Sequence, residues 1–185
     1  MSENYVIIMR GISGSGKSTV VEALETSLYL EATAHREEPP PEFCIVSADH
    51  YMVDESGNYA FDPRRLSEVH KECLRKFMMQ VVEKATDRSK YIVVDNTNTT
   101  TTEMSVYAQV ALALDWKLKI FTCLCDPGIA FQRQRHGVPS ANIYKQHLRL
   151  ESEAKRIPMN WGHEVLFPGE TDARVQEILR YLFKG

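Results

Sequence analysis

Short apolar runs recur along the chain, and the segments between them carry apolar residues at helical spacing. The runs predict strands at residues 5–9, 43–47, 91–94, 117–125 and 164–167. The intervening segments predict helices that begin near residues 17–19, 62, 126 and 171 and span about 102–114 and 140–156. Strands that alternate with helices favour a parallel sheet with both faces covered. We therefore expect one α/β domain, residues 1–185.

Between these elements, composition predicts where the chain turns. Residues 31–42 include a charged stretch and the prolines at 39–41, which predicts a surface connection. Gly57 marks a turn, and Asp62 followed by Pro63 predicts the cap and first position of a helix. Within that helix the apolar stripe comprises positions 66, 69, 73, 77 and 81, with 74, 78 and 82 beside it. We expect this stripe to face the core.

One glycine-rich stretch carries the strongest functional signal. Residues 11–18, GISGSGKS, match the phosphate-binding pattern G-x-x-x-x-G-K-[ST] and lie between a predicted strand and a predicted helix. Glycines let the backbone approach a phosphate closely, and N–H groups at a helix N-terminus attract anions. The alternative is a flexible turn. We expect a P-loop NTPase-type three-layer sandwich with a five-stranded, mostly parallel sheet and a helical lid. We expect ATP to be bound by Ser13, Gly14, Ser15, Gly16, Lys17, Ser18 and Thr19.

The chemistry expected of this loop is phosphoryl transfer. Lys17 is a compact cation suited to the β- and γ-phosphates, and the Ser18 hydroxyl is a ligand for Mg²⁺. Two aspartates, Asp49 and Asp95, follow predicted strands. Because ligands of such sheets lie beyond the carboxyl ends of the strands, we expect both carboxylates to converge on the loop.

The two aspartates receive different roles. Asp49 is the candidate general base for an acceptor hydroxyl, with a helix cap or a solvated carboxylate as the alternative. Asp95 ends an apolar strand in the manner of a Walker-B aspartate, so it could bind the acceptor or hold Mg²⁺ through water, a metal role that Asp49 could take instead. The alternative for Asp95 is a cap for residues 96–98.

Two arginines and two absences refine this prediction. Arg133 and Arg135 precede a break at residues 137–139, where a lid could hinge, and a mobile arginine would stabilise the transferred charge. The alternative is a solvated basic helix face. No Asn-Lys-x-Asp sequence occurs, which disfavours a guanine-specific GTPase. Asn96 rather than a glutamate follows Asp95, which favours transfer over hydrolysis.

Composition limits partners and location. The net charge of −3 means that the molecule as a whole is not a basic nucleic-acid binder. No apolar run is long enough to span a membrane, and the N-terminus has no pattern of a signal peptide. Cys44, Cys73, Cys123 and Cys125 are expected to be buried, reduced thiols, with Cys44, Cys123 and Cys125 in strands. Reduced thiols fit the cytoplasm or the nucleus.

Five blocks together resemble a known family. They are residues 11–19, 47–51, 57–63, 94–98 and 135–139, and their order resembles small P-loop kinases related to the 5′-hydroxyl polynucleotide kinase domains of repair enzymes. The resemblance covers about residues 5–156 and is closest to stand-alone members of uncertain substrate. It implies ATP as donor, a 5′-hydroxyl nucleic-acid end as acceptor, and Arg133 or Arg135 as the lid arginine. It implies an acceptor site at Asp49, Tyr51, Asp95 and Asn98.

One departure and two other functions stay open. The phage pattern has a phosphate-gripping arginine after the tyrosine, whereas this chain has Met52, which weakens the case for a polynucleotide acceptor. The second hypothesis is a kinase for a small alcohol such as a nucleoside, sugar or antibiotic. The third is an ATP-binding interaction module with little catalysis.

Overall fold

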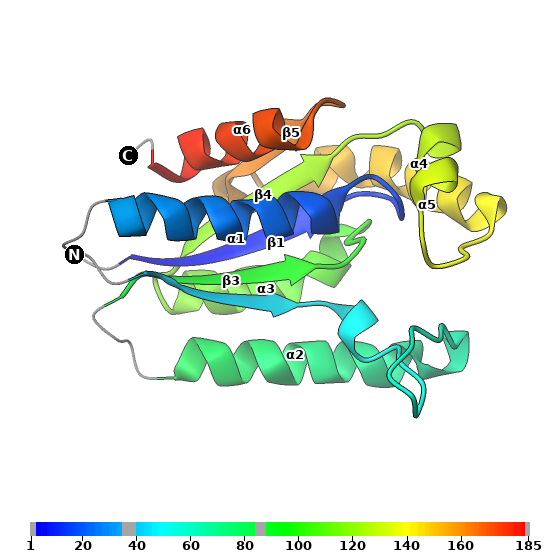
Figure 1. Ribbon diagram of the computed structural model, residues 1–185, viewed down its shortest axis with the longest axis horizontal. Coiled ribbons are helices and arrows are strands. Elements are labelled where there is room, and N and C mark those ends of the chain that lie inside the picture. Colours follow the sequence, from blue (N-terminus) through cyan, green and yellow to red (C-terminus); the bar gives the residue numbers. More distant parts are fainter. Residues whose placement is uncertain (1–2, 35–39, 84–87, 184–185) are drawn as a thin grey trace.

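The computed structural model describes residues 3–34, 40–83 and 88–183, and its centre is a parallel sheet. The strand order is β2-β3-β1-β4-β5, and every pairing is parallel. The strands are β1 (Asn4–Arg10), β2 (Glu42–Val46), β3 (Lys90–Asp95), β4 (Lys117–Cys123) and β5 (His163–Leu166). All of their carboxyl ends therefore meet at one edge, at the right in Figure 1.

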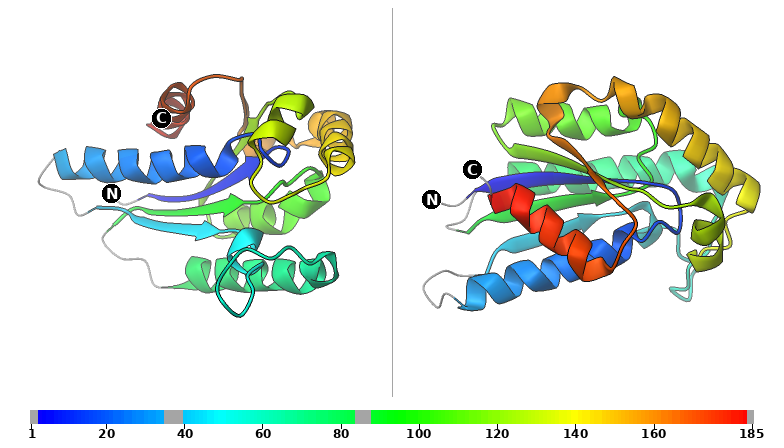
Figure 2. Two further views of the ribbon diagram at one scale, coloured as in Figure 1. Left: turned by 45° about the vertical axis from the view of Figure 1, so that its right-hand side comes forward. Right: turned by 90° about the horizontal axis from the view of Figure 1, so that it is seen from above.

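Helices cover both faces of this sheet. Helices α1 (Lys17–Ala34) and α6 (Thr171–Phe183) lie on one face, and α2 (Leu66–Val82) and α3 (Thr101–Ala113) lie on the other (Figure 1). Helices α4 (Pro127–Arg133) and α5 (Ser140–Glu153) lie together at the carboxyl edge of the sheet (Figure 2). The predicted three-layer α/β sandwich is confirmed, and the sheet is wholly parallel within the described residues.

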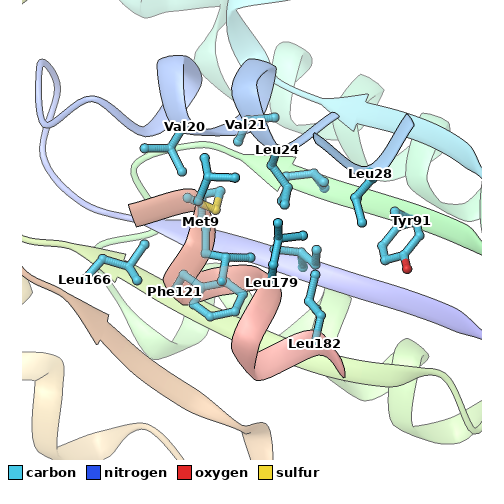
Figure 3. Close-up of a cluster of buried hydrophobic side chains, with 14 of the residues drawn as sticks. Met9, Val20, Val21, Leu24, Leu28, Tyr91, Phe121, Leu166, Leu179 and Leu182 are labelled. Carbon is cyan, nitrogen blue, oxygen red and sulfur yellow. The ribbon is translucent and has the colours of Figure 1, made fainter. Parts of the chain in front are cut away.

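The side chains of β1 alternate between the two faces of the sheet, which explains why two hydrophobic clusters form. Tyr5, Ile7 and Met9 pack into a cluster with residues of α1 and α6, which Figure 3 shows around Leu24, Phe121 and Leu179. The intervening Val6 and Ile8 pack into a second cluster with α2 and α3. Successive side chains of a strand point to opposite faces, so one buried strand serves both clusters.

Burial in these clusters supplies the main driving force for the fold. Leu24, Phe77 and Phe121 are wholly buried, and each such side chain contributes about 1.5–3 kcal/mol relative to exposure. Because the two clusters pack on opposite faces of β1, the carboxyl end of this strand is held in place. The glycine-rich loop at residues 11–18 begins at that end.

The predicted cap at Asp62 and the predicted turn at Gly57 are confirmed, and two further helices have caps of their own. Asp62 accepts a hydrogen bond from the backbone N–H of Arg64 and opens a short 3₁₀ turn that leads into α2. Asp126 caps α4, and Thr100 forms a capping box at α3 with Glu103. Gly57 lies in a turn with φ of 81°.

Several expectations were wrong in detail. Helix α1 continues to Ala34, so the surface connection does not begin at residue 31, and residues 35–39 lie outside the described residues. Strand β4 ends at Cys123, which places Cys125 in the following loop. In α2, Val69, Cys73, Phe77 and Val81 are buried as expected, but positions 78 and 82 are exposed because they lie beside the buried stripe. All four cysteines are free thiols as expected, but burial is confirmed only for Cys73 and Cys123, because Cys44 and Cys125 are partly exposed.

Candidate functional site

The glycine-rich loop connects β1 to α1 at the carboxyl edge of the sheet. Its start is held by the backbone N–H of Gly11, which donates to the carbonyl oxygen of Thr97 beyond β3 at 2.9 Å. Within the loop, the N–H of Ser15 donates to the carbonyl oxygen of Ile12 at 3.1 Å. The loop is thus attached to the neighbouring strand before it enters the helix.

Gly14 shows why this loop needs glycine. Its φ is 82°, in the left-handed region that favours glycine. A Cβ at Gly14 would overlap the carbonyl oxygen of Ala130, in α4. Ile12 also packs with Ala130 and with Ile143 of α5. Helices α4 and α5 therefore rest directly on the loop.

Lys17 is buried at the first turn of α1. Its Nζ donates to the carbonyl oxygens of Gly11 at 3.0 Å and Ile12 at 2.9 Å. Burial lowers the pKa of Lys17, and the negative charges of Asp95 and Asp49 oppose that shift. The predicted cation therefore lies under the loop and close to both predicted carboxylates.

Asp95 ends β3, is buried, and interacts electrostatically with Lys17. Burial raises the pKa of Asp95, whereas the charge of Lys17 and a hydrogen bond with the Ser18 side chain lower it. Its Oδ1 is buried and has no hydrogen-bond partner among the described residues. A buried carboxylate oxygen without a partner, beside a hydroxyl, is a donor set that suits Mg²⁺. The residues present therefore fit the expected magnesium ion.

Asp49 lies in a 3₁₀ turn, η1 (Ala48–His50), directly beyond β2. The turn is held by Ser47, whose Oγ accepts from the Asp49 N–H, and by Asn96, whose Oδ1 accepts from the Ala48 N–H at 2.8 Å. The Asp49 side chain is 45% exposed. The structure thus brings Asp49, Asp95 and Lys17 together, and the first of these remains open to solvent.

A contact between two distant loops lies over Asp49. The Nε2 of His136 is 3.5 Å from Asp49 Oδ2, and the His136 ring lies 3.9 Å from that of Tyr59, centroid to centroid. Burial raises the pKa of Tyr59 to about 12, and the charge of Asp49 and its hydrogen bond with the tyrosine add to the shift. Tyr59 and His136 therefore connect the turn before α2 with the loop between α4 and α5.

The predicted lid contacts the phosphate-binding loop through α5. Gln146 accepts a hydrogen bond through Oε1 from the backbone N–H of Ser13 at 2.9 Å. Arg133 ends α4, Arg135 follows it, and both are exposed. Both arginines thus lie beside the predicted lid. Their role in phosphoryl transfer stays a prediction.

Two predicted acceptor residues have other surroundings. Asn98 is buried, with φ of 45°, and its amide donates to the carbonyl oxygens of Met9 at 2.7 Å and Val94 at 3.4 Å. It supports the backbone beneath the site. The Tyr51 ring packs on the cluster under α2, and its phenol lies close enough to Cys73 for the two groups to interact electrostatically. Both residues therefore have contacts that support the fold, and a role for either in binding an acceptor stays a prediction.

The position after Tyr51 is occupied by a buried side chain. Met52 is 1% exposed, so this residue points into the protein. It therefore offers neither a charge nor an exposed group to a phosphate of an acceptor. The expectation drawn from Met52 against a polynucleotide acceptor stays a prediction.

Four residues of the site received no role from sequence reasoning. They are Tyr59, His136, Gln146 and Arg174. The guanidinium of Arg174 donates to the carbonyl oxygen of Ser15 inside the loop. The sequence does hold a signal that could have identified Arg174. Positions 174, 178 and 182 share one helical face, and positions 178 and 182 are apolar. A charged residue on such a face indicates a buried polar contact.

Comparisons with known proteins agree with this geometry. A family model described as "AAA domain" (AAA_33) matches residues 6–147. The solved structure of the Mycobacterium tuberculosis APS kinase CysC in complex with AMPPNP and APS is 16% identical, with a TM-score of 0.63, covering 98% of this chain and 99% of that one. A gluconokinase from Sinorhizobium meliloti 1021 is 17% identical, with a TM-score of 0.51, covering 98% and 93%. At these identities the likeness establishes the shared P-loop kinase-like fold.

No helix in the described ranges combines the length and the apolar character needed to cross a lipid bilayer.

Proposed function

The chain belongs to the AAA domain family, and we propose that it is an ATP-dependent phosphotransferase whose acceptor is the hydroxyl group of a small molecule. The donor half of this proposal rests on the loop at residues 11–18. Its glycines, buried Lys17 and the N-terminus of α1 combine close backbone approach with positive charge. Ser18 and Asp95 would hold Mg²⁺, which neutralises charge on the phosphates.

Acceptor activation is assigned to Asp49. Its carboxylate is partly exposed, close to Lys17, and on the side of the loop where β2 and β3 end. In the proposed reaction Asp49 accepts the proton of the acceptor hydroxyl while that oxygen bonds to the γ-phosphorus and ADP leaves. His136, 3.5 Å away, orients this carboxylate.

The observation that carries the choice of acceptor is the contact of Tyr59 with His136. It joins two loops directly beside the proposed base, with ring centroids 3.9 Å apart. This contact occupies one side of Asp49, while the carboxylate stays 45% exposed. A small alcohol needs less room beside the contact than a polymer strand does, which supports the small-molecule acceptor.

The solved structures support the same choice at the level of analogy. The two named above are kinases, one bound to APS and the other named for gluconate, and both names refer to small molecules. The sequence blocks at residues 47–51 and 94–98 favoured a 5′-hydroxyl nucleic-acid end. That acceptor is therefore the competing outcome of the test.

The test is a transfer assay with γ-labelled ATP and Mg²⁺. The protein is incubated with nucleosides, sugars and aminoglycosides in one set and with 5′-hydroxyl DNA and RNA oligonucleotides in another. We expect a labelled small alcohol, and no label with Lys17→Ala. Label on the oligonucleotides alone would overturn the choice of acceptor. ATP binding without label in either set would favour the nucleotide-binding interaction module.

A further inference from the structure

Arg174 is a buried arginine outside the residues assigned to transfer. It lies in the first turn of α6 and is 7% exposed. None of the ion pairs found in residues 3–34, 40–83 and 88–183 includes it. A buried cation is costly unless polar groups replace its water, so its contacts must supply that replacement.

Three backbone carbonyl oxygens provide these contacts. The Arg174 guanidinium donates through Nη1 to Ser15 at 2.9 Å, through Nη2 to Leu124 at 2.8 Å and through Nε to Phe167 at 2.9 Å. Ser15 lies in the phosphate-binding loop, while Leu124 and Phe167 directly follow β4 and β5. One planar group thus contacts three segments at the carboxyl edge of the sheet.

A second observation shows that the Arg174 guanidinium lies close to the loop. A Cβ at Gly16 would lie 3.4 Å from Nη1 of Arg174, so the guanidinium lies against the loop at the residue before Lys17. Its charge is also felt nearby, because it opposes the rise that burial produces in the pKa of Cys123 and Cys125. Since no ion pair among the described residues neutralises this cation, its charge acts on the loop beside it.

We propose that Arg174 is a positioning residue that holds the phosphate-binding loop in register with the segments after β4 and β5, and that nucleotide affinity depends on its guanidinium. The loop's N–H groups bind phosphate only when their directions converge. Ser15 is the loop residue whose carbonyl Arg174 fixes, and the neighbouring N–H groups follow its orientation. Lysine has one point charge and lacks the planar fork needed for three separate acceptors.

This inference rests on nucleotide binding, the donor half of the proposed function, and is independent of the acceptor. The experiment therefore measures ATP binding by calorimetry with no acceptor present. It compares the unaltered protein with Arg174→Met, Arg174→Lys and Arg180→Met. Arg180 is an exposed arginine of the same helix and serves as the matched control.

We expect Arg174→Met to raise the Kd for ATP roughly tenfold to hundredfold, the range that corresponds to losing a buried hydrogen-bond partner of the loop. Arg174→Lys should raise it severalfold, and Arg180→Met should leave it unchanged. In the transfer assay the KM for ATP should rise while the KM for the acceptor stays the same, a division that general loss of folded protein would not produce.

The outcomes separate the two proposals. If the unaltered protein fails to bind ATP, the proposed function fails. If it binds ATP and the Arg174→Met and Arg174→Lys variants bind equally well, the role of Arg174 is overturned. Should Arg174→Met not fold, Arg174→Lys decides alone, because it keeps the charge and removes the fork.

Discussion

On the β2–β3 side of the phosphate-binding loop, carboxylates lie with few partners, whereas on the β4–β5 side cations are held by backbone carbonyls. Asp95 has a buried oxygen without a hydrogen-bond partner among the described residues, and Asp49 is 45% exposed. On the other side, Arg174 donates to three carbonyl oxygens. A buried carboxylate oxygen without a partner can bind a ligand, whereas the three contacts of Arg174 are directed to backbone carbonyl oxygens of the fold.

Arg10, the last residue of β1, is a second buried cation that contacts backbone carbonyl oxygens, and its Nε has no hydrogen-bond partner among the described residues. Arg10 is 1% exposed and donates to the carbonyl oxygens of Leu150 at 2.7 Å and Thr99 at 3.2 Å. Burial lowers its pKa to about 10, and the charges of Glu153 and Glu103 oppose the shift. Arg10 thereby fastens α5 to the base of the loop. We infer that the β2–β3 side of the loop supplies the groups that react, and that the β4–β5 side holds the loop in position.

The strongest test of this difference between the two sides is to neutralise the exposed carboxylate of Asp49. Asp49→Asn keeps the size of the side chain and removes its capacity to accept a proton. We expect kcat to fall by about 10²–10⁴, the typical contribution of a general base, with the Kd for ATP unchanged. Steady-state transfer assays and calorimetry on the same preparations measure both quantities.

The control for this change is Asp54→Asn in the following turn. Asp54 is exposed and accepts from the backbone N–H groups of Ser56 and Asn58, so its loss should leave kcat unchanged. An Asp49→Asn protein that loses ATP affinity as strongly as it loses rate would place Asp49 with the donor, and the division between the two sides would fail.

A smaller effect is expected at the point where α4 rests on the loop. Gly14→Ala would strain a residue with φ of 82° and would press a methyl group into the Ala130 carbonyl. We expect transfer to fall about tenfold to hundredfold because the loop must shift. The strain should also lower the free energy of unfolding by about 1–2 kcal/mol. Urea unfolding and transfer assays measure the two effects.

Gly57→Ala is the matched control for that change. Gly57 has φ of 81°, and a Cβ there would have nothing within 4 Å among the described atoms. It should therefore cost the same backbone strain and leave transfer intact. Equal transfer rates in the Gly14→Ala and Gly57→Ala proteins would mean that α4 does not constrain the loop.

The sequence was sufficient to predict the features that repeat or lie close together along the chain. The alternation of residues 5–9, the P-loop pattern and the caps at Asp62 and Asp126 are local, and the structure confirms the fold they imply. The convergence of Asp49 and Asp95 on Lys17 was also predictable, because parallel strands bring their carboxyl ends to one edge.

Contacts between distant loops were beyond that reasoning. Tyr59 and His136 meet only because the turn before α2 and the lid loop fold toward Asp49. Asn98 shows a different difficulty, since an amide after a strand can bind an acceptor or hold backbone carbonyls with the same local sequence. Its contact with Met9 depends on where β1 lies, and the sequence pattern does not specify this.

The smallest expected effect lies on the β4–β5 side and concerns stability alone. His163 begins β5, and its Nε2 is 2.8 Å from Thr122 Oγ1, which also accepts from Arg10 at 3.4 Å. Burial lowers the pKa of His163, and the positive charge of Arg10 adds to the shift. The folded protein therefore favours the neutral ring more strongly than the unfolded chain does.

The sign of the pH dependence follows from that shift. Above the unfolded pKa of about 6.5 both states hold a neutral ring, and below it the unfolded chain takes up the proton first. His163 should therefore make the free energy of unfolding fall with decreasing pH, by at most about 1.4 kcal/mol per pH unit between its unfolded and folded pKa values. Urea unfolding between pH 5 and 8 should show a shallower acid decline in His163→Gln, with the Kd for ATP at pH 8 unchanged. An identical decline in both proteins would show that His163 titrates alike in the two states. A weakened ATP affinity would place it with the site, against the division drawn here.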